Sequence, residues 1–169
     1  MKCSTTLPVH VFTRLAGEKD GFWQPFDEGP GYFEIDPALE VMLYLPRAED
    51  ETVEILCNEW RDVPLLYQID VSEGRRVTDE GLRFLSRFSQ LRALNMSACS
   101  ISNIGLEHLM DMPALIWLDL SHCTGVSDKG LRRLETMRQL TYVNLRGLPR
   151  VTQAGLKRLA KNKSLQIRR

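Results

Sequence analysis

One pattern returns along this sequence at intervals of 24 or 25 residues. Each copy opens as L-x-x-L-x-L and continues with an aliphatic residue, then Ser or Thr, then a polar residue. A glycine follows two residues later, and two leucines spaced three apart close the unit. Self-similarity at such a period is typical of chains that stack small structural units. The four copies begin at Leu66, Leu91, Leu115 and Leu140.

Physical chemistry assigns a structure to each part of the unit. The alternating apolar residues predict a short strand, and Ser or Thr before a polar residue predicts the N-cap of a helix. The predicted N-caps are Thr78, Ser102, Ser127 and Thr152. One unit cannot bury its apolar side alone, so units must stack, strand beside parallel strand. We therefore predict an α/β fold, a short right-handed solenoid of parallel strands plus helices.

The segment from Leu115 to Leu134 reads LxxLxLSxCxxVSDxGLxxL. In this pattern it resembles the cysteine-containing type of leucine-rich repeat, and the resemblance covers residues 63–169. Two units carry the cysteine, as Cys99 and Cys123. The resemblance implies a recognition module, such as the substrate-binding arms of F-box ubiquitin ligase subunits. Residues 1–62 contain nothing like an F-box.

The segment before the repeats divides into two parts. Residues 40–62 resemble a degenerate first repeat, with strand positions Leu43 and Leu45 and an acidic start before an apolar helix face. We interpret residues 1–39 as a β-rich N-terminal cap, because a solenoid must cover its terminal apolar surface. The alternative is that the aromatic-rich segment 21–33 forms a binding loop. The candidate covering residues are Phe22, Trp23, Phe26, Tyr32 and Phe33.

Residues between the strand leucines should point onto the concave face of the stack and form columns. The first column holds Trp117 and Tyr142 on neighbouring strands, and Arg146 lies in the third column, four residues after Tyr142. These residue types are the ones most enriched at interface hot spots. The Asp/Asn column beside them is expected mainly to hydrogen-bond neighbouring strands. The predicted partner-binding residues are Gln68, Ala93, Trp117, Tyr142, Asn95, Asp119, Asn144 and Arg146.

A formal net charge of zero hides an asymmetry along the chain. Residues 1–62 hold 5 basic and 13 acidic groups, which leaves 17 basic and 9 acidic groups in residues 63–169. The basic repeat portion keeps open an alternative in which the chain binds nucleic acid or another polyanion. A further alternative is an enzyme with an unrecognised site in the N-terminal cap. The leading hypothesis is a non-enzymatic module that binds another protein.

The remaining predictions concern cysteines, cofactors and location. The four cysteines form no CxxC pair, which disfavours a zinc ribbon or a disulfide framework. We expect Cys99 and Cys123 to be buried and inert, and we expect no metal and no cofactor. The sequence has no 18-residue apolar run and no secretory signal, which predicts a cytoplasmic protein outside the membrane.

Overall fold

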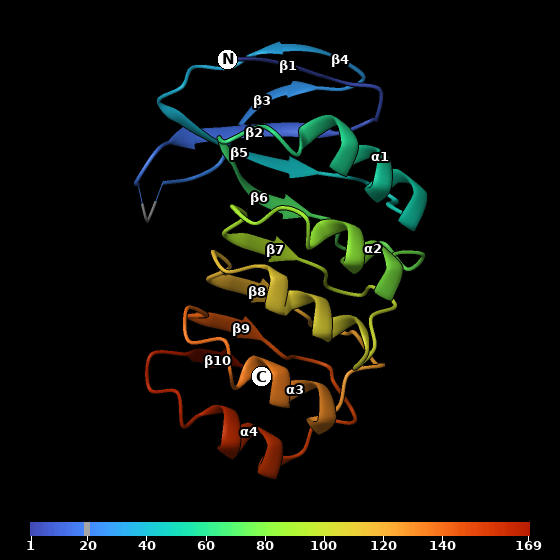
Figure 1. Ribbon diagram of the computed structural model, residues 1–169, viewed down its shortest axis with the longest axis vertical. Helices are drawn as coiled ribbons and strands as arrows, with labels where there is room; N and C mark the ends of the chain where they lie inside the picture. The colour runs from blue at the N-terminus through green and yellow to red at the C-terminus, as the bar shows by residue number, and fades with distance from the viewer. Residues whose placement is uncertain (19–20) are drawn as a thin grey trace.

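The computed structural model describes residues 1–18 and 21–169. Eight strands form one sheet in the order β10-β9-β8-β7-β6-β5-β2-β3, and β1 and β4 pair in a second, two-stranded sheet. Figure 1 shows the units piled along the long axis, with the helices on one side of the large sheet. The N-terminal strands are β1 (Lys2–Thr5), β2 (His10–Leu15), β3 (Gln24–Glu28) and β4 (Gly31–Glu34).

The six strands from β5 to β10 run parallel to one another. They are β5 (Leu39–Tyr44), β6 (Leu66–Asp70), β7 (Ala93–Asn95), β8 (Trp117–Asp119), β9 (Tyr142–Asn144) and β10 (Gln166–Arg168). The leucine positions lie in register, because Leu94 pairs with Leu118 and Leu118 pairs with Val143. The predicted parallel α/β arrangement is confirmed.

A short helix follows each parallel strand except the last. The helices are α1 (Asp50–Trp60), α2 (Asp79–Leu85), the 3-10 helix η1 (Gly105–Asp111), α3 (Asp128–Leu134) and α4 (Gln153–Leu159). The leucine pairs Leu82/Leu85, Leu106/Leu109 and Leu131/Leu134 are fully buried between helix and sheet. No helix in the described residues is long and apolar enough to cross a membrane.

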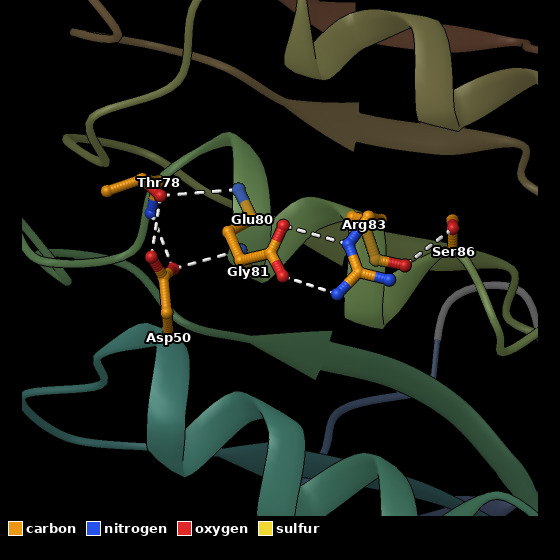
Figure 2. Close-up of polar contacts among 6 residues, drawn as sticks. All are labelled: Asp50, Thr78, Glu80, Gly81, Arg83 and Ser86. Carbon is orange, nitrogen blue, oxygen red and sulfur yellow. Dashed lines mark hydrogen bonds and ion pairs between the residues drawn. The ribbon is translucent and has the colours of Figure 1, made fainter.

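Polar bonds between successive helix starts join each unit to the next (Figure 2). The Asp50 carboxylate accepts the Thr78 backbone N–H at 2.8 Å, the Thr78 hydroxyl at 2.6 Å and the Gly81 N–H at 2.9 Å. Meanwhile the Thr78 hydroxyl oxygen accepts the Glu80 N–H and so caps α2. At each later junction the backbone N–H of the Ser or Thr again donates to the preceding unit, Ser102 to Asp79, Ser127 to Asn103 and Thr152 to Asp128. The glycine bond recurs at Gly130, whose N–H donates to Asn103.

The repeated glycine is required by these bonds. A Cβ added to Gly81 would lie 2.5 Å from the Asp50 carboxylate oxygen, and one added to Gly130 would lie 2.6 Å from the Asn103 side-chain oxygen. At Gly155 the three nearest atoms would all belong to the Asp128 carboxylate. The glycine therefore leaves room for the side chain that caps the next unit.

The N-terminal residues extend the sheet and cover its end. Strand β2 pairs antiparallel with both β5 and β3. Phe33 of β4 is buried, with its ring centroid 6.0 Å from that of Trp60 in α1. Of the five candidate covering aromatics of segment 21–33, only Phe33 is buried. Phe22, Tyr32 and Phe26 are 87%, 71% and 40% exposed.

Two further details differ from the sequence-based expectation or complete it. Residues 105–111 form a 3-10 helix. The sequence could not predict the helix type, because leucines spaced by three residues share a face in both α and 3-10 helices. The second detail is the register of the last strand, β10. Ile167 pairs with Val143, which places Leu165 at the first leucine position of a unit that is one residue shorter.

The glycine ladder predicts an inverted substitution effect at Gly155. Helix propensity alone would make Gly155→Ala stabilising by about 1 kcal/mol. We expect it instead to lower the free energy of unfolding by about 1–2 kcal/mol, since overpacking costs about 1–3 kcal/mol. Urea unfolding measures the change. In an Asp128→Ala background the same substitution should become neutral or stabilising, and an unchanged loss there would contradict the clash.

The alternation of buried and open strand positions predicts unequal costs at neighbouring residues. Leu118 is fully buried, whereas Trp117 is only partly covered. Leu118→Ala should lower the free energy of unfolding by about 2–5 kcal/mol. Trp117→Ala should cost clearly less in the same urea melts. Equal losses would show that the assignment of inner and outer faces is wrong.

Candidate functional site

The face of the large sheet that points away from the helices carries the predicted binding residues. We call it the open face, and it corresponds to the face expected from sequence to be concave. The strand register confirms the columns, since Gln68 pairs with Ala93, Ala93 with Trp117, and Trp117 with Tyr142. Successive strands lie about 4.8 Å apart, so side chains within a column are neighbours.

Trp117 and Tyr142 form a stacked aromatic pair. Their ring centroids are 5.4 Å apart and their planes are inclined by 4°. Both side chains are partly exposed. The expectation that these two rings stand side by side on the outer face is confirmed. Because each ring holds the other, the pair offers a flat apolar surface with little conformational freedom left to lose on binding.

The second column consists of Asp70, Asn95, Asp119 and Asn144, and internal hydrogen bonds link its side chains. The Asn95 amide donates to Asp70 at 2.8 Å, and the Asn144 amide donates to Asp119 at 2.7 Å. Asp119 also accepts the Ser121 N–H, and Asn144 accepts the Arg146 N–H, two residues ahead of each. Asn144 is only 7% exposed. These side chains fix the strand ends, as the expectation of a mainly structural column proposed.

A groove of about 590 Å³ lies beside the aromatic pair on the open face. Its floor includes Ala93, whose methyl side chain stands between the longer side chains of Gln68 and Trp117 in the first column. Ala93 itself is only 3% exposed, so it contributes space rather than contact area. Arg14 and Glu40 line the same groove from the N-terminal strands.

Arg14 closes one end of this groove and was missed by the sequence analysis. Its guanidinium carbon lies 4.3 Å from the ring centroid of Trp23 and 4.4 Å from that of Tyr67. The same guanidinium forms an ion pair with Glu40 at 2.8 Å. Trp23 thus packs on a cation at the groove rim and not on the end of the apolar core. Only the pairing of β2 with β5 brings these groups together.

Two more residues extend the first column beyond the repeats. Phe12 pairs with Met42, and Met42 pairs with Gln68, so the first column continues from β9 to β2 and ends in two apolar residues. The alternation around Phe12 signals a strand. Its partner strand is set by a long-range antiparallel contact that no repeat in the sequence marks.

The far end of the open face is basic. Arg146, at the end of β9, is exposed. Arg168 of β10 pairs with Asn144 and so continues the second column beside it. The structure therefore places Arg146 in the same region as the aromatic pair, as predicted, and adds Arg168.

The repeat cysteines are buried on the opposite side of the strands. The Cys99 thiol donates to the Val71 carbonyl at 3.3 Å, and the Cys123 thiol donates to the Met96 carbonyl at 3.1 Å. Burial raises the pKa of both thiols to about 12. Each thiol therefore links one unit to the preceding one as a neutral donor, which agrees with the expected inert packing.

Comparison with solved structures supports the fold. No family model matches the sequence. The structure of leiomodin-1 actin-binding site 2 superimposes with a TM-score of 0.57 at 11% identity, over 69% of this chain and 73% of the other. The tropomodulin C-terminal domain of Caenorhabditis elegans gives a TM-score of 0.56 at 12% identity, over 73% and 80% of the two chains. The chain shares their fold.

The buried thiols give a chemical prediction. Cys99 and Cys123 should react slowly with a thiol reagent at pH 8 in the native protein, because a pKa near 12 leaves almost no thiolate. In denaturant the pKa returns toward its ordinary value and labelling should become fast. Mass spectrometry of the labelled peptides separates the two sites. Fast native labelling of both would contradict their burial.

Proposed function

We propose that this chain is a protein-binding module whose partner docks on the open face, centred on Trp117 and Tyr142. The observation that carries the proposal is the stacked, partly exposed aromatic pair beside a groove. Aromatic and arginine side chains dominate the binding energy of protein interfaces, and Arg146 completes that combination here. An apolar side chain of the partner would fill the space above Ala93 and pack against Trp117.

The eight residues predicted from sequence take different parts in this proposal. Trp117, Tyr142 and Arg146 make the main contacts, and Gln68 contacts the partner across the groove. Ala93 keeps the groove open. The remaining three hold the strand ends in register and present only their outer edges, namely Asn95, Asp119 and Asn144.

The fold also has a finer interpretation. We interpret residues 63–169 as a leucine-rich-repeat solenoid of the cysteine-containing type, which the recurring Cys99 and Cys123 thiol bonds support. Residues 40–62 act as its first unit, since Asp50 fills the same bonding position as Asp79 and Asp128. Residues 1–39 act as its cap. Four free thiols support a reducing compartment, and we propose the cytoplasm.

The structural neighbours favour binding over catalysis. The leiomodin-1 fragment is described as an actin-binding site, and this chain shares its fold at low sequence identity. We therefore propose a non-enzymatic role with a protein partner. Actin is the first defined protein to test, and partners enriched from the source cell are the second.

Alanine substitutions on the open face test the proposal. Trp117→Ala and Tyr142→Ala should each weaken partner binding by at least about 1–2 kcal/mol, the scale of a buried aromatic anchor. Binding to purified actin is measured by calorimetry. Proteins enriched on immobilised wild type are identified by mass spectrometry and compared with those on the two variants. Urea melts verify that each variant is folded.

Tyr32→Ala is the matched control, because Tyr32 is an exposed aromatic on the small two-stranded sheet, away from the open face. It should leave binding unchanged. Binding that survives both open-face substitutions but disappears when residues 21–33 are altered would move the site to the N-terminal segment and end the proposal.

A further inference from the structure

We propose a second binding site on the helix side of the C-terminal units, formed by α3, α4 and the turns that follow them. Its ligand is the phosphate backbone of a double-stranded nucleic acid, bound without reading the base sequence. This surface lies across the sheet from the open face, so the proposal is independent of the protein-binding site (Figure 1).

The charge of this region is far from balanced. Residues 128–169, from the start of α3 onward, contain twelve Lys or Arg residues and two acidic residues, Asp128 and Glu135. The resulting net charge of 12 − 2 = +10 is concentrated in the last two units of a chain whose formal net charge is zero. Like charges this close together repel one another, but they attract polyanions and steer them to the surface.

Most of these cations lack an acidic partner. Within the described part of the chain, only two of the twelve form an ion pair with a carboxylate, Arg133 with Glu107 at 2.8 Å and Arg158 with Glu135 at 3.5 Å. In residues 63–128, by comparison, two of the five cations are paired, Arg76 with Glu49 and Arg83 with Glu80. Arg146 and Arg168 belong to the open face and do not contribute to this surface. The exposed cations of α3, α4 and the following turns that have no acidic partner are Lys129, Arg132, Arg138, Lys157, Lys161 and Lys163.

The repeat arranges several of these cations in rows. Arg132 and Lys157 occupy the same position in consecutive helices, 25 residues apart, and Arg138 and Lys163 occupy the same position in the following turns. All four are exposed, and α3 packs directly against α4. In the preceding unit the position of Arg132 holds an acidic residue, Glu107. In α2 this position holds Arg83, which is paired with Glu80. The second row has no basic counterpart in the two earlier units, which hold Ser89 and Pro113 at that position. Unpaired cations in both rows are therefore specific to the last two units.

The absence of apolar side chains identifies the ligand class. The large hydrophobic residues that are exposed in the described part of the chain all precede residue 129, and the last two are Ile104 and Met110. A protein interface needs an apolar core, whereas interfaces with nucleic acid are polar and strongly positive. Binding of single strands relies on bases stacked on aromatic rings, and this face presents none. Of these ligands, the phosphate backbone of a duplex fits this surface best.

Fluorescence anisotropy with a labelled random-sequence 20-base-pair DNA duplex tests the site. We expect binding at low salt that weakens steeply as salt rises, because each neutralised phosphate releases counterions. The variant Arg132→Gln with Lys157→Gln should bind about tenfold more weakly. Its log–log salt slope should be shallower by about 2, since each lost phosphate contact removes about one unit.

The matched control is Arg83→Gln with Arg87→Gln, which removes two basic side chains from α2 and the turn that follows it. It should bind the duplex like wild type. An RNA duplex of the same length is expected to bind comparably if phosphates alone are recognised, and preference for one duplex would identify the source of the phosphates.

Three results would overturn the proposal. These are no duplex binding at low salt, equal loss in the α2 control, or equally tight binding of a polyglutamate peptide or of phosphatidylserine vesicles. Trp117→Ala should leave duplex binding intact, and this separates failure here from failure of the protein-binding site.

Discussion

The structure depends on a side chain at the start of each helix that bonds to the start of the next. Asp50, Asp79, Asn103 and Asp128 each accept hydrogen bonds from the Thr or Ser of the following unit. The bonds from Thr152 hold the pKa of the Asp128 carboxyl below its ordinary value. Because this side chain must fit against the next helix, the glycine near the start of that next helix leaves the room that a Cβ would fill. One contact thus sets the repeat length, the helix start and the stacking.

Regular stacking then determines what the open face can offer. Because the strands are in register, the third residues of all units form one column, and the fifth and seventh residues form two more. The Asp/Asn column alternates acceptor and donor, so Asp70 pairs with Asn95 and Asp119 with Asn144, whereas two adjacent carboxylates would repel each other. That column is committed to the backbone. The first-column side chains do not hold the strand ends in this way, so they can contact a partner.

Sequence reasoning predicted the repeated part well and the N-terminal part poorly. Strand positions such as Leu118, the N-cap Ser127 and the Trp117–Tyr142 neighbourhood follow from local periodicity, which the stack merely repeats. The groove does not follow, since it needs Arg14 brought to Tyr67 by antiparallel pairing of β2 with β5. The exposure of Phe22 was also unpredictable. An aromatic residue in a glycine-rich segment gives no periodic signal of which side it faces.

A repeat protein supplies its own internal comparison, because each unit meets the same structural demands. Positions that every unit fills alike, such as the buried leucines and the glycine, are explained by stability. Positions where one unit departs from its neighbours at the surface are not. Trp117 and Tyr142 depart from Gln68 and Ala93 in the first column, and Arg138 and Lys163 depart from Ser89 and Pro113 in the turns after the helices. Both departures fall in the last units of the chain but on opposite sides of its sheet. Two ligands could therefore occupy the same end of the molecule together, one apolar in character and the other anionic.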